Sequence, residues 1–206
     1  MGKTLHPRGL PGESDLRAAP RLRPGGGAES GLPWPVGTRN LTTNMRLSTH
    51  TLRQLSYAQG YLELGMTNHA AEALGQIGEA ERAATPVLAV WLAVCTERGE
   101  WDKAAEIAAV LCQCEPRVAW HWIQWAYATR RSDSLAAARA ILMRGVGLHP
   151  LEAVFHFNLA CYEAQLGHID DARAFLDTAC GLDAKFVELA KSDDDLAPLR
   201  AIEPKG

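Results

Sequence analysis

Histidine and cysteine are the side chains in this sequence from which an active site or a metal centre could be built. After residue 44 the histidines are scattered along the chain, as His50, His69, His121, His149, His156 and His168. No carboxylate pair recurs beside them, and the chain has no nucleophile elbow, glycine-rich phosphate loop, HExxH motif or pair of CxxC spacings. This pattern indicates a protein that is not an enzyme and has no catalytic residues.

The five cysteines all fall within stretches of helical periodicity, at Cys95, Cys112, Cys114, Cys161 and Cys180. Cys112 and Cys114 are two positions apart, so on a helix their thiols point to different sides and cannot share a zinc ion. The number is odd and no disulfide framework is apparent. We therefore expect buried, reduced thiols, with no metal and no cofactor.

The composition indicates a folded protein, because 47% of the residues are hydrophobic. No stretch approaches the roughly 18 unbroken apolar residues that a membrane span requires. The first 30 residues also lack the apolar core of a secretory signal. These observations predict a cytoplasmic protein that does not use a membrane as a partner.

Residues 1–44 differ in composition from the rest of the chain. They hold eight Gly and six Pro, with six Lys/Arg against three Asp/Glu, and no helical or strand period persists in them. Such a segment is expected to be disordered. Three explanations stay open: an organelle transit peptide, a flexible functional tail, or an upstream extension from a misplaced start. We favour the last, because Met45 immediately precedes the ordered pattern.

The charge of the remaining residues argues against a nucleic-acid partner. Subtracting the first 44 residues from the whole chain leaves 15 basic against 21 acidic side chains, a formal charge of −6. Proteins that bind the phosphate backbone draw most of their affinity from clustered Lys and Arg. We therefore expect a protein or peptide as the ligand.

A pattern 34 residues long occurs four times without a gap, in blocks that begin at Thr51, Thr85, Ala119 and Ala153. The twentieth place of each block is alanine, at Ala70, Ala104, Ala138 and Ala172. Two antiparallel helices pack closely only where small side chains meet at the crossing. The fifteenth place, where the first helix should end, reads Gly65, Gly99, Asp133 and Gly167, residue types that tolerate a left-handed backbone.

These blocks, 51–84, 85–118, 119–152 and 153–186, resemble the tetratricopeptide repeat (TPR), and they cover about two-thirds of the chain. The resemblance implies an all-α fold: a right-handed α-solenoid of four helix-turn-helix units. The sequence departs from the family pattern at the fourth place, which the family often fills with Trp, and at Leu92 and Gly145. The fourth place reads Gln54, Leu88, Trp122 and His156.

The sequence after the fourth block, FVELAKSDDDLAPLR, no longer follows the period. Phe186, Val187, Leu189 and Ala190 give one apolar face, which suits a capping helix over the open end of a stack. Asp195 is then expected to cap the short segment 196–200. The expected array therefore spans 45–200, with its cap at 187–200 and a tail at 201–206, and the ending resembles that of many bacterial TPR arrays.

The family resemblance implies a concave groove lined by the first helix of each unit. In the third and fourth blocks the places that face it include aromatic and guanidinium groups, which are enriched at protein-binding hot spots. The candidate peptide-binding residues are Trp120, Ile123, Tyr127, Arg130, Arg131 and Phe157. An acidic-aromatic or acidic-aliphatic peptide would suit them. The alternative is that Trp120 and Phe157 only pack between repeats and the arginines are solvated.

The sequence thus predicts a scaffold or adaptor that binds a peptide segment of a partner protein. A dedicated chaperone for one client and the regulatory subunit of an enzyme are the alternatives. Self-association through the weakly capped first unit is a further hypothesis. Trp91, Trp101, Trp122 and Trp125 stand at packing places and are expected to belong to the core.

Overall fold

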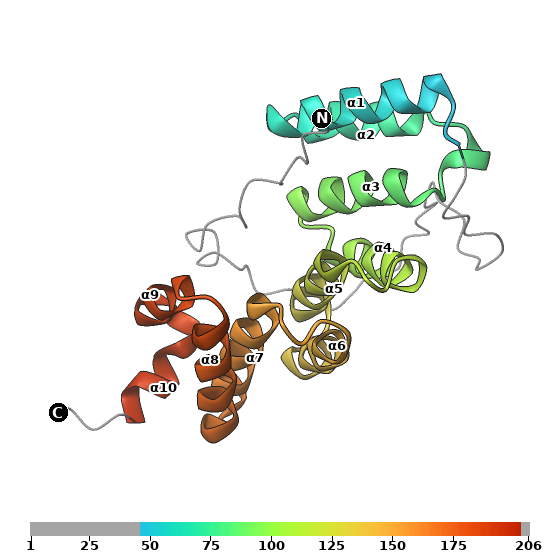
Figure 1. Cartoon of the computed structure of the whole chain (residues 1–206). Helices are drawn as coiled ribbons and strands as arrows, with labels where there is room; N and C mark the ends of the chain where they lie inside the picture. Colours follow the sequence, from blue (N-terminus) through green and yellow to red (C-terminus); the bar gives the residue numbers. More distant parts are fainter. Residues whose placement is uncertain (1–45, 203–206) are drawn as a thin grey trace. The chain divides into compact units, whose positions relative to one another are not determined.

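The computed structural model describes residues 46–202, which belong to one compact unit. The expectations for residues 1–44 and 203–206 lie outside this part. Between residues 46 and 202 all regular secondary structure is helical (Figure 1). The α-helices are α1 (Thr49–Glu63), α2 (Thr67–Gly75), α3 (Thr85–Glu97), α4 (Trp101–Cys114), α5 (Ala119–Ser132), α6 (Leu135–Leu148), α7 (Ala153–Leu166), α8 (Ile169–Leu182), α9 (Lys185–Ser192) and α10 (Ala197–Ile202).

Each of the four sequence blocks contains one pair of helices. The pairs are α1/α2, α3/α4, α5/α6 and α7/α8, and helices that follow one another in sequence pack against each other. Two short 3-10 helices, η2 (Glu79–Glu81) and η3 (Asp194–Leu196), lie outside these pairs. The expected fold class is confirmed: the chain is an all-α solenoid of helical repeats.

Alanine at the twentieth place is completely buried in every block, with 0% exposure at Ala70, Ala104, Ala138 and Ala172. At the eighth place, Ala58, Ala126 and Ala160 are also fully buried, and Leu92 is buried too. Small side chains at these places let the two backbones of a helix pair approach. The packing role predicted for the twentieth place is therefore confirmed.

The first helices end in two different ways. Gly65, Gly99 and Gly167 have positive φ, at 71°, 67° and 83°, as the expected turn requires. Asp133 does not adopt that conformation, since its φ is −127° and its ψ is −92°. The prediction at Asp133 was wrong because Ser134 controls this turn: it is extended, and its side chain accepts a hydrogen bond from the Ala137 N–H to begin α6.

Gly145 is required by a close contact rather than by its backbone angle. A Cβ atom added there would lie 2.4 Å from Cε1 of Phe155, whose side chain is fully buried. Most helices would be more stable with alanine at this position. The departure from the family pattern at Gly145 therefore makes room for a larger aromatic ring from α7.

The residue at the fourth place, where the family often has Trp, makes the same type of hydrogen bond in the third and fourth blocks. Trp122 Nε1 donates to the carbonyl of Pro116 over 3.0 Å, and His156 Nε2 donates to the carbonyl of Pro150 over 2.8 Å. Both rings thus bond the proline that ends the preceding block. His156 replaces Trp here without losing the contact between successive units.

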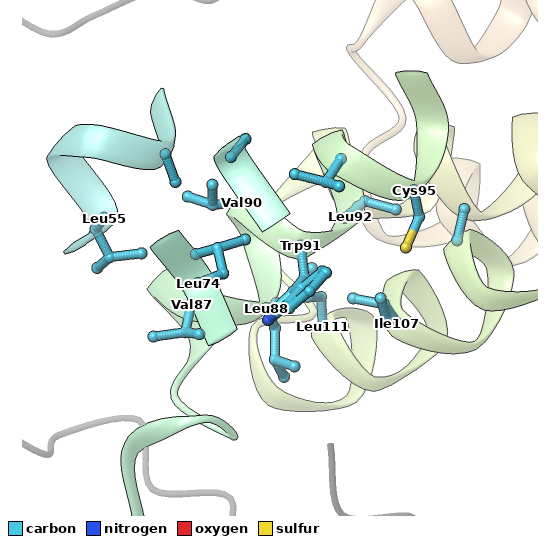
Figure 2. Close-up of a cluster of buried hydrophobic side chains, with 14 of the residues drawn as sticks. Leu55, Leu74, Val87, Leu88, Val90, Trp91, Leu92, Cys95, Ile107 and Leu111 are labelled. Carbon is cyan, nitrogen blue, oxygen red and sulfur yellow. The ribbon is translucent and has the colours of Figure 1, made fainter. Parts of the chain in front are cut away.

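The core consists of two neighbouring clusters of buried side chains. The first lies among α1 to α5 and includes Leu74, Val87, Ile107 and Leu111, as Figure 2 shows. The second lies among α4 to α10, and the half-buried Trp125 packs against both clusters. Trp91 and Trp122 are buried, as expected for core residues.

The segment after α8 covers the last repeat. Phe186 of α9 is buried and stacks on Phe157 of α7 with ring centroids 4.7 Å apart, and Leu196 and Leu199 are buried as well. The capping residue differs from the prediction, because Asp193 caps η3 by accepting the Asp195 N–H. The Asp195 carboxylate is thereby left available for another contact.

Candidate functional site

The six predicted binding residues do not form one surface. Ile123 and Phe157 are only 6% and 7% exposed, so both belong to the core. Phe157 is covered by Phe186, the aromatic residue of the capping helix. Ile123 and Phe157 therefore present little area to a ligand.

Trp120 is 41% exposed at the beginning of α5. It precedes Arg131 by eleven residues in the same helix. At 1.5 Å per residue this separates the two positions by roughly 16 Å along the helix axis. Trp120 is therefore accessible, but it lies at the opposite end of α5 from the arginines.

The structure brings Tyr127 and Arg131 together, and Trp101 of α4 joins them. The Arg131 guanidinium carbon lies 3.6 Å from the centroid of the Tyr127 ring and 4.9 Å from that of Trp101. The rings of Trp101 and Tyr127 meet edge to face, with centroids 5.7 Å apart. We call Trp101, Tyr127 and Arg131 the Arg131 cluster.

The electrostatic state of Arg131 follows from its half-buried position. Burial lowers its pKa, and the neighbouring charge of Arg130 lowers it further, whereas Tyr127, Tyr162 and the charge of Asp195 act in the opposite direction. Within residues 46–201, no carboxylate forms an ion pair with Arg131. Its polar contact is Nη1 to the carbonyl of Tyr127, at 3.4 Å. Arg131 is thus a positive charge that stacks against two aromatic rings and has no carboxylate within ion-pair distance among the described residues.

Arg130 is next in sequence but has a different environment. Its Nη1 and Nη2 donate to Oδ2 and Oδ1 of Asp195 over 2.6 and 2.9 Å, and its guanidinium lies 5.1 Å from the Tyr162 ring centroid. Burial would lower the pKa of Arg130, but the hydrogen bonds and charge of Asp195 outweigh it and raise the pKa. Burial also raises the pKa of Tyr162 to about 12. The charge of Arg130 is therefore already matched inside the chain.

The chain holds Asp195 in place through α7. Gln165 Nε2 donates to the Asp195 carbonyl over 2.9 Å, and Cys161 Sγ lies 3.8 Å from Oδ2 of Asp193. Cys161, Gln165, Tyr127, Arg130 and Arg131 all belong to first helices of the third and fourth units. Cys161 is buried, and we call the surface formed by the other four residues the first-helix face.

Sequence reasoning missed two contributors to this face. Trp101 was assigned to the core but is only half-buried, and it begins a second helix. Gly99 was a usable signal that Trp101 follows a tight turn. Its backbone is left-handed, and a Cβ atom added to it would lie 3.6 Å from Nε1 of the Trp101 indole. Asp195 was interpreted as a cap, and its distance from Arg130 along the chain hid the ion pair.

Two groups of side chains have donor atoms close enough to hold a metal ion: Cys161, Asp193 and Asp195, and Glu163, His168 and Asp171. In the second group, Glu163 is fully buried, but its carboxylate already accepts from Arg139 Nε and contacts His168 Nδ1 at 2.7 Å. These contacts compensate the buried charge without a cation. In the second group the geometry is therefore that of an ion-pair network formed by Glu163, Arg139 and His168.

The five cysteines are free thiols, and three of them, Cys95, Cys112 and Cys161, are buried as expected. The expected burial is wrong for Cys114 and Cys180, which are half-buried. Burial raises the pKa of Cys95 to about 11 and that of Cys112 to about 12. Burial also raises the pKa of Cys161 well above its ordinary value. At neutral pH these thiols stay protonated, and a protonated thiol is a poor nucleophile.

The comparison with solved structures supports the repeat architecture. The crystal structure of MamA protein superposes with a TM-score of 0.63 at 15% sequence identity, over 73% of this chain and 80% of that one. This likeness suggests a TPR-like fold of helical repeats. No family model and no curated protein matches the sequence. None of the described helices has the length and apolarity needed to cross a bilayer.

Proposed function

We propose that this chain is a TPR protein that acts as a scaffold or adaptor by binding an acidic segment of a partner protein. The TPR-like fold suggests a protein-interaction scaffold in general. The acidic ligand, the binding residues and the cytoplasmic location are our proposal. The observation that carries it is the Arg131 cluster, a positive charge stacked against two aromatic rings with no carboxylate in ion-pair contact among the described residues.

The geometry of the cluster explains the proposed specificity. A guanidinium that stacks on aromatic rings keeps its N–H donors at the edge, where a carboxylate can accept two hydrogen bonds. Trp101 and Tyr127 are both half-buried, and they supply apolar area beside that edge. A ligand with Asp or Glu next to an aromatic or aliphatic residue would satisfy both parts.

Arg131 rather than Arg130 is the proposed anchor for the ligand. Arg130 already has a bidentate partner in Asp195, so an incoming carboxylate gains no unmatched charge there. Arg131 offers that charge, and its half-buried position strengthens the electrostatic attraction. The two adjacent arginines therefore have different roles in this proposal.

The test is binding of fluorescein-labelled peptides in which Asp or Glu alternates with Phe or Leu, followed by anisotropy. Arg131→Gln should weaken binding by about 1–3 kcal/mol, because it removes a central charged anchor. Arg173→Gln is the matched control, since Arg173 is an exposed arginine on α8. Equal affinity of the Arg131→Gln variant and the unmodified protein would reject the proposal, as would equal binding of Lys-rich peptides.

A dedicated chaperone or an enzyme's regulatory subunit would use the same chemistry on the same surface. The three possibilities differ in what happens to the bound protein. A chaperone would lower aggregation of its client, and a regulatory subunit would change the rate of the enzyme it binds. A scaffold needs neither effect. Measuring client aggregation and enzyme rate with an identified acidic partner therefore distinguishes the three possibilities.

A further inference from the structure

The chain carries an acidic segment of its own on the first-helix face. Residues Asp193–Leu196, which we call the acidic segment, include η3, and η3 packs against α7. The Asp195 carboxylate of this segment pairs with the guanidinium of Arg130, the neighbour of the proposed anchor Arg131. Part of the face proposed for a partner is thus filled from within the chain.

The contacts of the acidic segment are those expected of a bound peptide. Its Asp195 carboxylate pairs with a guanidinium, and its main-chain carbonyl at Asp195 accepts from Gln165. The next residue, Leu196, is fully buried. The segment therefore combines acidic and aliphatic chemistry, which is the ligand class proposed above for the first-helix face.

We infer that the acidic segment competes in cis with an acidic partner segment for Arg130. This inference rests on the proposed function, because it assumes that the partner is acidic. Arg130 is the adjacent residue of α5, about 1.5 Å away along the axis and about 100° around it, so a partner that binds Arg131 and extends around α5 toward the capping segment reaches Arg130 and displaces Asp195 there. The partner's carboxylate then replaces that of Asp195, so the guanidinium is not left without a counter-charge.

The flanking contacts indicate that this exchange is local. The side chains of Arg130 and Asp195 are 28% and 24% exposed, so water and a ligand can reach the pair. Phe186, Leu196 and Leu199 are buried and hold the segment on both sides of Asp195. Moving one carboxylate away from Arg130 does not require α9 or α10 to unfold.

The experiment uses a labelled peptide with the sequence of residues 190–200, AKSDDDLAPLR, added to the full chain. Asp195→Asn removes the competing charge in cis, and Asp177→Asn on the exposed side of α8 is the matched control. The peptide should bind the Asp195→Asn variant about tenfold or more tightly than the unmodified protein, because a bidentate charged pair becomes available. The Asp177→Asn variant should bind like the unmodified protein.

Two further variants show whether the peptide uses Arg130. Adding Arg130→Gln to Asp195→Asn should abolish the gain, and adding Arg130→Lys should keep only part of it, because lysine retains the charge but not the fork. At one peptide concentration, the melting temperature of the Asp195→Asn variant should also rise more than that of the unmodified protein. Equal peptide affinity with and without Asp195, or a gain that survives Arg130→Gln, overturns the inference.

Failure of the inference and failure of the proposed function give different results. If Arg131→Gln weakens acidic peptides but Asp195→Asn has no effect, the competition in cis is wrong and the proposed function stands. If Asp195→Asn gains affinity through Arg130 while Arg131→Gln is neutral, the proposed function with Arg131 as its anchor is wrong, and the competition in cis for Arg130 stands.

Discussion

Arg130 and Arg131 show how two adjacent side chains of one type take different roles. They lie 100° apart around α5, so one faces the capping segment and the other faces α4. Arg130 is matched by Asp195, whereas Arg131 is held by the rings of Trp101 and Tyr127. The sequence predicted both as binding residues, because a helical pattern does not reveal a carboxylate that is distant along the chain.

This difference predicts unequal effects of the two arginines on stability. Arg130→Gln should lower the free energy of unfolding by about 1–3 kcal/mol, because it leaves Asp195 without its partner in a partly buried place. Arg131→Gln should change it by less than about 1 kcal/mol, since no ion pair is lost. Urea unfolding followed by circular dichroism measures both. Equal losses for the two variants would show that the assignment of roles is wrong.

Among the helices, α6 gives the clearest case in which packing overrides intrinsic preference. It contains two glycines near its end, Gly145 and Gly147, and helix propensity alone treats them alike. Gly145 faces the Phe155 ring, whereas a Cβ at Gly147 would have no neighbour within 4 Å. The two positions are therefore a natural pair for comparison.

Gly145→Ala should destabilise the protein by about 1–3 kcal/mol, because the added methyl group overpacks against Phe155. Gly147→Ala should stabilise it by up to about 1 kcal/mol through helix propensity. Thermal unfolding of both variants tests this expectation. Phe155→Leu in the Gly145→Ala background should recover part of the loss, and a stabilising Gly145→Ala would contradict the contact.

At the scale of the elements, the sequence predicted most of what the structure contains. Blocks with alanine at a fixed place predict the helix pairs, because close helix crossings need a small residue whatever the rest of the sequence is. Asp133 and Asp195 were less predictable. In each case a neighbouring residue, Ser134 or Asp193, performs the capping role, and choosing between such neighbours depends on backbone angles that the pattern does not encode.

For the described part of the molecule as a whole, the two ends of the repeat array differ. The last unit is covered by α9 and α10, whereas the first has no preceding unit to cover α1. Tyr57 stands at the seventh place and is 52% exposed, while its equivalents Trp91 and Leu159 are 8% and 0% exposed. A hollow of about 230 Å³ lies beside it, lined by Tyr57, Tyr61, His69 and other residues of α1 and α2.

We expect a second copy of the chain to cover this exposed side of the first unit. Sedimentation velocity should show a sedimentation coefficient that rises with concentration, because apolar area is buried in the contact. Tyr57→Glu should return the protein to a monomer by placing a charge there. A monomer at all concentrations, with the same profile for the variant, would exclude this contact.

The central claim is that the Arg131 cluster binds an acidic segment, and nuclear magnetic resonance tests it most directly. A titration with an Asp-Leu peptide should shift the Arg131 Nε–H and Trp101 Nε1–H signals first and most strongly, because the ligand carboxylate and leucine contact these groups. Arg131→Gln should remove the Trp101 shift, while Arg173→Gln should leave it unchanged. Shifts confined to α8 or to the first unit, with the Trp101 signal unmoved, would contradict the account.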